Sequence, residues 1–452
     1  MVTDSTTLKA NLEKIPFSDL PKTFQDAVIT TRQLGLRYLW IDSLCIIQDS
    51  QEDWERHCAR MPEIYKNSTV TVAGPGAIDC TSGFLQPREK PLSSVGLEIR
   101  NGEVSGPVTL SYCGTISAFY PGLEKDSPLS NRAWVLQERL LSRRVLYFGT
   151  SFMYFECCTN ARHETLHFPF QDYYQERNEA AKTSFRVEHE PSVWLQYWNQ
   201  IVTTYSQAAL TFPSDRLPAL SGIAREIQRK IRDKYIAGLW CMDLPIGLMW
   251  FIHSSEKRSG ISKEHGEGPP PYIAPSWSWA SVSSGVSFCN LNYQDHVLVS
   301  PDLRILHAHT EVRGLDAFGK VQKGSLVLEG KCQSFIVRVE PHRFISDRMS
   351  FHVYSGNSQR LGEYHPDEYD IDFRGQTRTG SIPHIWFEET ITLLYLGHFE
   401  GSVRQWVALA IEPIVGTEGQ YRRVGLTSGS SPDFAEIGIF FDGVEKRRLE
   451  II

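Results

Sequence analysis

The sequence predicts an α/β fold at the N-terminus, built on a parallel sheet, followed by a helical region and a mainly β C-terminal region. Helix-like and strand-like patterns alternate as far as Gly76, which is typical of an open sheet with right-handed crossovers. Helical periodicity then marks Trp194–Gln207 and Leu217–Lys234, and short apolar runs between turn residues follow Ser325. The expected regions are an α/β domain at 1–160, a helical extension at 161–259, a loop or linker at 260–271 and a mainly β region at 272–452.

Two helices are expected in the α/β domain. The first follows Pro21, whose fixed φ suits a helix start, and ends at Gly35. Its side chains at helical spacing are Phe24, Ala27, Val28, Thr31 and Leu34. The second begins after Ser50, which forms a capping-box pattern with Asp53. Its apolar stripe consists of Trp54, Cys58, Met61 and Tyr65.

Two strands are expected to alternate with these helices. The run from Tyr38 to Ile47 is nearly continuously aromatic and branched, which predicts a strand covered on both faces. The run Thr69–Ala73 is β-branched and ends at the turn residues Gly74-Pro75-Gly76. Helix, strand, helix and strand in this order favour parallel pairing of the two strands.

Polar side chains lie within and after the first predicted strand. Ligands of open α/β sheets bind beyond the carboxyl ends of the strands, so this segment is a candidate site. Asp42 and Asp49 could position a ligand hydroxyl, or they could cap a turn, and the sequence favours a structural or mixed role. The candidate pocket-lining side chains are Asp42, Ser43, Cys45, Gln48 and Asp49. Cys45 has no histidine nearby in sequence and is expected to be a small buried hydrophobe rather than a nucleophile.

In the later regions, the apolar stretch Ile236–Ile252 contains Asp243 and Pro245 and is short for a bilayer span. We expect it to be a buried helix pair.

Trp277 and Trp279 are two residues apart within Pro275–Ser281. We expect them to close a core, and carbohydrate stacking is the minor alternative. The expected C-terminal strands start at Ser325, Phe335, Ile391, Trp406 and Ile437.

Composition excludes several classes of protein. The chain has 452 residues, of which 41% are hydrophobic, and this suffices for packed cores. A formal charge of −7 supplies no basic field for nucleic acid. Nine cysteines without repeated spacing indicate reduced thiols, and no signal peptide or membrane span is recognised, so a cytoplasmic location is expected.

Two short motifs are treated as chance matches. His163-Glu-Thr-Leu-His167 has the spacing of a zinc protease helix, but Pro169 follows too closely and apolar flanks are missing, so no metal site is expected. Gly314–Lys320 resembles a phosphate loop, but Val321 replaces the required hydroxyl, so a β-turn is expected.

Two segments of this chain resemble one known family. The first starts with LPKTFQDAV at Leu20 and continues with LGLRYLWIDSLCIIQDSQEDWERHCARMPEIYKNSTVTVAG at Leu34–Gly74; the second is PLSNRAWVLQERLLSRRVLYFG at Pro128–Gly149. Both are similar to motifs of the fungal heterokaryon-incompatibility domain. The resemblance implies a role in self/non-self recognition and programmed cell death, and a distant relation to the TIR fold, a flavodoxin-like parallel sheet. It also implies a homo-oligomer or other incompatibility-pathway proteins as partners.

The chain departs from this family in one respect. Family members open with a strand similar to Y-x-A-L-S-x-x-W-G, which is central in a TIR-like sheet, and nothing comparable precedes Pro21. The first strand is therefore expected to be missing, with another segment in its place, or the chain is a truncated or inactive remnant.

The candidate chemistry lies in the helix expected around Arg132–Ser142. Trp134 and Glu138 are four residues apart and share one helix face, with Arg132, Arg139, Arg143 and Arg144 nearby in sequence, and an aromatic ring beside a carboxylate suits a nucleotide. The pattern also resembles the W-C-x-x-E-L helix of TIR domains that cleave NAD. That resemblance implies Glu138 as the catalytic residue, Trp134 and Arg132 as substrate contacts, NAD as substrate and no cofactor.

Alternatives remain for this helix and for the chain. Glu138 and the following arginine could form a solvated ion pair of little energetic worth, and Trp134 could belong to the core. The chain would then be a non-enzymatic signalling module that acts by homotypic assembly.

Overall fold

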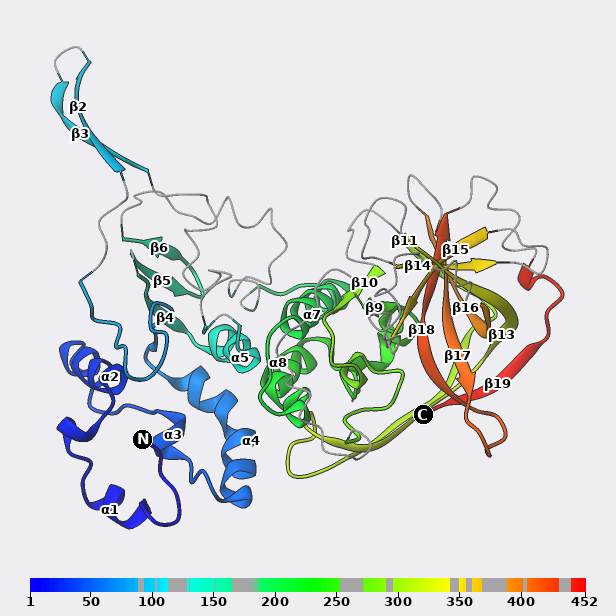
Figure 1. The fold of residues 1–452 in the computed structure, drawn as a ribbon, viewed down its shortest axis with the longest axis horizontal. Helices are drawn as coiled ribbons and strands as arrows, with labels where there is room; N and C mark the ends of the chain where they lie inside the picture. Colours follow the sequence, from blue (N-terminus) through cyan, green and yellow to red (C-terminus); the bar gives the residue numbers. More distant parts are fainter. Residues whose placement is uncertain are drawn as a thin grey trace, which may run out of the picture. The chain divides into compact units, whose positions relative to one another are not determined.

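The structure is a computed structural model, in which the chain forms two compact units. It describes residues 1–87, 93–101, 104–112, 128–129, 131–150, 152–164, 182, 185, 187–252, 271–289, 296–341, 349–354, 360–367, 388–400, 405–430 and 440–452. Unit 1 comprises 1–188, 208–210 and 219–223, and unit 2 comprises 189–207, 211–218 and 224–452. Figure 1 shows the elements of both units along the chain. No helix in these described residues is both long enough and apolar enough to cross a membrane.

Unit 1 contains five α-helices and six strands within its described residues. In chain order they are α1 (Leu8–Glu13), α2 (Lys22–Gln33), α3 (Asp42–Cys45), α4 (Gln51–Asn67), β1 (Thr71–Ala73), β2 (Ser93–Asn101), β3 (Val104–Tyr112), α5 (Ala133–Leu141), β4 (Arg144–Phe148), β5 (Met153–Cys157) and β6 (Ala161–His163), with a 3-10 turn at Phe17–Asp19.

The sheet of unit 1 is mixed, with the order β1-β4-β5-β6. β1 pairs with β4 in parallel, so that Val72 faces Leu146, whereas β4–β5 and β5–β6 are antiparallel. The expected strand at Thr69–Ala73 and its termination by Gly74 are confirmed, and so is an α/β unit with parallel pairing at the N-terminus. β2 and β3 form a separate antiparallel hairpin.

The segment Tyr38–Ile47 is not a strand, so that prediction was wrong. Tyr38 is 87% exposed, and the chain turns into the short helix α3 at Asp42. The described residues give this apolar run only an isolated bridge from Ile47 to Thr3 as β pairing. A strand is stable only when a neighbouring strand satisfies its backbone N–H and C=O groups. In the described part of the chain β1 pairs with β4 alone, so β1 is not a partner for Tyr38–Ile47.

Both predicted helices of the α/β region are present. α4 is capped by the Ser50 side chain, which accepts a hydrogen bond from the Asp53 backbone N–H at 3.2 Å, as expected. α2 ends before Gly35, but its buried side chains are Asp26, Thr30 and Thr31, and of the predicted stripe only Thr31 is among them. The Asp26 carboxylate is satisfied there by Lys22 and by the backbone N–H groups of Phe84 and Leu85.

Unit 2 begins with helices, as expected. Its helical part contains α7 (Pro191–Ser206), α8 (Ser221–Ile231), α9 (Leu244–Gly247) and short 3-10 turns at Pro213–Asp215, Pro218–Leu220, Cys241–Asp243 and Trp279–Ser281. Residues 219–223, which end the second of these turns and begin α8, belong to unit 1. Short strands accompany them: β7 (Tyr235–Ile236), β8 (Leu239–Trp240), β9 (Trp250–Ile252) and β10 (Val286–Phe288).

The stretch Ile236–Ile252 is mostly buried but is not a helix pair, which corrects the prediction. β7 and β8 pair across a tight turn at Ala237 and Gly238, and both of these residues have positive φ. Positive φ interrupts a helix, and Pro245, in the first turn of α9, does not allow this helix to extend toward the N-terminus.

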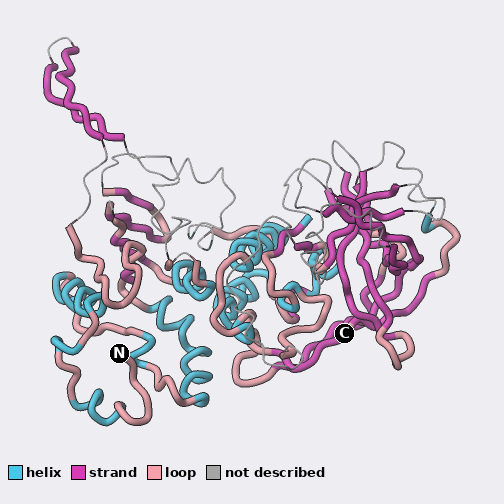
Figure 2. The backbone as a smooth tube through the Cα atoms, viewed as in Figure 1, coloured by secondary structure: helices cyan, strands magenta, loops and turns pink. Residues whose placement is uncertain are grey.

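The rest of unit 2 is a large sheet whose strands pair antiparallel except for β18 with β19; strands are magenta in Figure 2. Its strands are β11 (His296–Val299), β12 (Arg304–Val312), β13 (Val321–Pro341), β14 (Met349–Tyr354), β15 (Arg360–Pro366), β16 (Glu388–Glu400), β17 (Gln405–Pro413), β18 (Gln420–Ser430) and β19 (Lys446–Ile451). The pairings close on themselves, from β13 through β16, β17, β18, β15 and β14 back to β13. The mainly β prediction is confirmed, and the turn expected at Gly314–Lys320 joins β12 to β13. The predicted strand at Ile437 lies mostly outside the described residues, as does the predicted linker.

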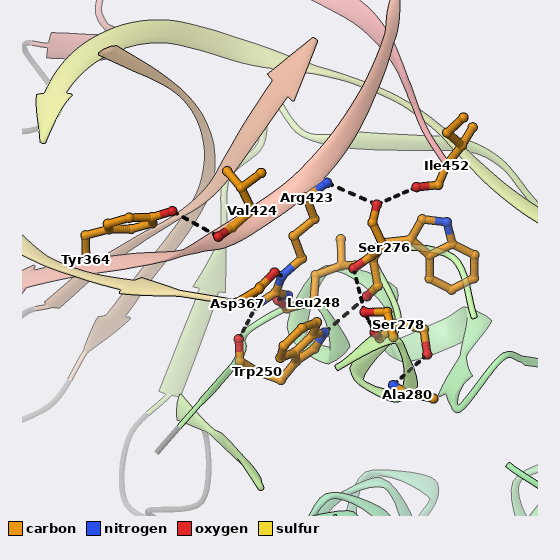
Figure 3. Close-up of polar contacts among 12 residues, drawn as sticks. Leu248, Trp250, Ser276, Ser278, Ala280, Tyr364, Asp367, Arg423, Val424 and Ile452 are labelled. Atoms are coloured by element: carbon orange, nitrogen blue, oxygen red, sulfur yellow. Dashed lines mark hydrogen bonds and ion pairs between the residues drawn. The ribbon is translucent and has the colours of Figure 1, made fainter. Parts of the chain in front are cut away.

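The core of unit 2 contains a buried arginine (Figure 3). Arg423 on β18 forms an ion pair with Asp367 at 2.8 Å, and its guanidinium carbon lies 3.3 Å from the ring centroid of Trp250. It also donates to the Leu248 carbonyl at 2.8 Å. A buried charge is tolerated when it is paired and hydrogen-bonded, and these contacts meet that condition.

The Trp277 and Trp279 side chains are fully buried, so the expected core role is confirmed. Trp279 Nε1 donates to the Gly238 carbonyl at 2.9 Å, and the same oxygen accepts from Trp198 Nε1 at 2.8 Å. Trp279 lies in a short 3-10 helix rather than in a strand.

Candidate functional site

The predicted catalytic helix is α5, which begins after Arg132 and ends before Ser142. Its buried face consists of Ala133, Gln137, Leu140 and Leu141. The Gln137 side chain accepts from the Gly222 N–H at 2.6 Å, and the Ser142 hydroxyl contacts the Thr71 hydroxyl at 2.6 Å. These contacts fix the helix, and they leave Trp134 and Glu138 half-buried on another face.

Glu138 lies in a cluster of polar side chains from three helices. The Tyr65 hydroxyl on α4 hydrogen-bonds its carboxyl group, and Asp42 of α3 and Arg132 are close enough to influence its charge. Burial, reinforced by the negative charge of Asp42, raises the pKa of Glu138 to about 7, against the opposing effects of Arg132 and Tyr65. A partly accessible carboxyl group with a raised pKa is typical of functional sites.

Tyr65 is the partner that holds the Glu138 carboxyl group. Its ring packs edge-on against Trp40, with ring centroids 5.7 Å apart. Burial and the neighbouring carboxylates of Glu138 and Asp42 raise the pKa of Tyr65 well above its usual range. The phenol therefore stays protonated at neutral pH and donates to Glu138.

The structure brings together only some of the predicted site residues. Asp42, Arg132 and Glu138 form one electrostatic cluster, with Trp134 one helical turn before Glu138 on the same helix.

The remaining loop residues have local roles. Asp49 accepts from the Ser5 backbone N–H at 2.8 Å, and Gln48 donates to the Ile46 carbonyl at 3.0 Å. Ser43 is half-buried, and its backbone carbonyl accepts from the Thr3 N–H at 2.9 Å. Cys45 is exposed, contrary to the expected buried position.

Sequence reasoning missed Tyr65 and Trp40. Tyr65 belongs to the apolar stripe of the second predicted helix, and its hydroxyl gave no separate signal. Trp40 was assigned to a buried strand that does not form. Their roles depend on contacts between segments distant in sequence.

Glu138 does not pair with Arg139. The Arg139 guanidinium forms a bidentate ion pair with Glu156 on β5, with both N–O distances at 3.1 Å, and the Tyr147 hydroxyl donates to the same carboxylate at 3.1 Å. The interpretation of Glu138 as half of a surface ion pair with the next residue is therefore not supported by this geometry.

The described residues contain no group of three or more histidine, cysteine or carboxylate side chains placed to hold a metal ion. The motif starting at His163 continues past residue 164, outside the described residues.

The family model described as "Heterokaryon incompatibility protein (HET)" matches residues 2–138, which contain the whole cluster around Glu138. No curated protein and no solved structure matches the chain.

Proposed function

Because this chain is a heterokaryon incompatibility (HET) domain protein, with the matching domain at residues 2–138, we propose that it is a fungal cell-death effector that hydrolyses NAD. The family itself implies a function related to heterokaryon incompatibility. In the proposal Glu138 is catalytic, Trp134 and Arg132 contact the substrate, and the protein acts in the cytoplasm as an assembly of its own copies or with other incompatibility proteins.

The proposal includes a distant relation of the HET domain to TIR domains. It is supported by the parallel pairing of β1 with β4, and by the position of α5, with its Trp-x-x-x-Glu pattern, directly before β4. It further divides the chain into this domain at 1–160, a helical extension to residue 259 and the β region from residue 272.

The observation that carries the proposed chemistry is the environment of Glu138. Nicotinamide leaves NAD as a neutral molecule, so bond cleavage needs no general acid, and one carboxylate can stabilise the oxocarbenium-like ribose. The Tyr65 hydroxyl hydrogen-bonds the Glu138 carboxyl group, and the residue is half-buried. Trp134, one turn away, supplies a ring on which a base can stack.

The test is NAD consumption by purified full-length protein at several concentrations. We expect turnover by the wild type that rises steeply with protein concentration, because assembly would complete the site. Glu138→Gln should lower the rate by at least about 100-fold, the scale of a lost electrostatic contact to the transition state. Glu63→Gln, which changes an exposed glutamate on α4, is the matched control and should leave the rate unchanged.

Two results would contradict the proposal in different ways. Undiminished turnover by a folded Glu138→Gln protein would remove Glu138 from the chemistry. No turnover by folded wild type at any concentration would favour the non-enzymatic assembly module.

A further inference from the structure

A second polar cluster lies in unit 1, around the buried ion pair of Arg139 and Glu156. Lys182 is 2% exposed, and no described residue accepts a hydrogen bond from its ammonium group. Among the residues that the structure describes, the cluster holds two cationic side chains, Arg139 and Lys182, but only one carboxylate, that of Glu156. An uncompensated buried charge is costly, so this arrangement favours an additional anion nearby.

Cys157 is placed to supply that anion. It ends β5, where a tight turn leads into β6, and its backbone N–H donates to the Asn160 carbonyl at 2.8 Å. Its sulfur lies 3.3 Å from the Thr159 hydroxyl and also accepts from the backbone N–H groups of Thr159 and Asn160. Two backbone N–H groups and one hydroxyl, which can donate or accept, thus converge on one half-buried sulfur atom.

The electrostatics agree with this geometry. Burial opposes ionisation of Cys157, but the Thr159 and Asn160 hydrogen bonds and the Lys182 charge outweigh it, so the pKa of the thiol is lowered. Burial lowers the pKa of Lys182 to about 8, against the opposing effect of Glu156. Lys182 also interacts electrostatically with the neighbouring Cys158, but the Cys158 thiol donates to the Arg143 carbonyl at 3.6 Å.

We propose that Cys157 is a reactive thiolate and a site of oxidative modification by hydrogen peroxide, with Lys182 and the Thr159–Asn160 donors as its activating groups. Thiolates react with peroxides and alkylating agents, whereas thiols do not, and activated cysteines lie in partly exposed, electropositive surroundings. The reactivity of Cys157 is independent of NAD hydrolysis and of Glu138.

The thiolate sulfur attacks one peroxide oxygen, so that an S–O bond forms as the O–O bond breaks, and the sulfur loses two electrons to the peroxide. The departing hydroxide takes the sulfenic proton, which leaves sulfenate and water.

The experiment compares thiols within the same full-length protein. Reduced protein is treated briefly with iodoacetamide at neutral pH, and alkylation at each cysteine is followed by mass spectrometry. Cys45 and Cys80 are the internal controls, because both are exposed. We expect Cys157 to react about ten-fold faster than either control, despite its lower accessibility. After dilute hydrogen peroxide, dimedone should label Cys157 first.

Matched variants separate activation from accessibility. Thr159→Val and Lys182→Met should each slow alkylation of Cys157 several-fold, whereas Thr159→Ser and Lys182→Arg should retain most of the rate, because they keep the hydroxyl or the charge. If Lys182→Met does not fold, comparison of Thr159→Val with Thr159→Ser still tests the proposal. Cys157 reacting no faster than Cys45 and Cys80, or equal rates in Thr159→Val and Thr159→Ser, would overturn the proposal.

Discussion

Glu138 and Arg139 are neighbours in sequence, yet their side chains have different partners. Glu138 binds Tyr65 near Asp42, and Arg139 binds Glu156. The shared face of Trp134 and Glu138 could be predicted, because helical spacing fixes it. Tyr65 could not be assigned to Glu138, because that contact depends on how α4 packs against α5.

A residue-scale prediction concerns the stability effect of Glu138→Gln. The folded pKa of Glu138 is about 7, above its ordinary value of 4.5, so the folded state holds this proton more tightly than the unfolded state. Above about pH 7 the ionised carboxylate therefore opposes folding, and glutamine removes this penalty. We expect the variant to gain roughly 1–3 kcal/mol in free energy of unfolding at pH 8, and little at pH 4.5.

Urea unfolding of wild type and variant at both pH values measures this difference. A functional carboxyl group is expected to cost stability, whereas a purely structural one supports it. A loss of stability at pH 8 in Glu138→Gln would assign Glu138 to the structural framework.

At the scale of single elements, local signals predicted helices better than strands. A helix makes its backbone hydrogen bonds within one segment, so local signals can predict it. Such signals here are Pro21, the Ser50 cap and the Trp134–Glu138 spacing. The apolar run at Tyr38–Ile47 has the composition of a strand, but a strand also needs a neighbour, and no local signal supplies one. At Ile236–Ile252 the backbone turn at Gly238 is the reason that two short strands form in place of a helix. Composition alone does not predict that turn.

That turn gives an element-scale prediction. Gly238 has φ of +95°, and a Cβ atom added there would lie 2.5 Å from Trp279 Nε1. Gly238→Ala should therefore cost roughly 2–4 kcal/mol, from backbone strain and from displacement of the buried indole. Gly416→Ala is the control, because φ there is +85° and nothing lies within 4 Å of the added atom.

Chemical denaturation with tryptophan fluorescence compares these two variants. The control reports backbone strain alone, so the difference between them isolates the contact with Trp279. Equal losses of unfolding free energy in both variants would show that the Trp279 side chain moves aside at no measurable cost.

At the scale of the whole molecule, the sequence predicted an α/β region, helices and a mainly β region in the right order. The closure of the large sheet was not predictable, because β13 pairs with strands on both sides and with β19, more than a hundred residues later. Such pairings depend on the complete set of strands rather than on any local pattern.

A whole-molecule prediction concerns pH. Burial and Asp233 raise the pKa of Asp243 to about 7, and Glu138 is shifted similarly, so the folded state binds more protons than the unfolded state between about pH 4 and 7. Stability contributed by both groups therefore falls as pH rises through that window. Burial would raise the pKa values of Asp26 and Glu156, but Lys22 lowers the first and Arg139 lowers the second. The stability that these two carboxylates contribute is therefore lost in acid.

The expected result is maximal thermal stability at mildly acidic pH, about 5, with a decline toward pH 8. Thermal unfolding across this range measures it, and Asp243→Asn should flatten the decline. Stability that increases steadily from pH 5 to 8 in the wild type would contradict these assignments.

The pairing of β19 with β13 also governs when the protein can fold during synthesis. Leu326 pairs with Ile451, and Ser276 binds the Ile452 carbonyl, so the strand residues of β13 complete their pairing only after β19 has been synthesised. Apolar strand surface of unit 2 therefore stays uncovered until β19 is available, and that interval is when this protein most needs chaperones.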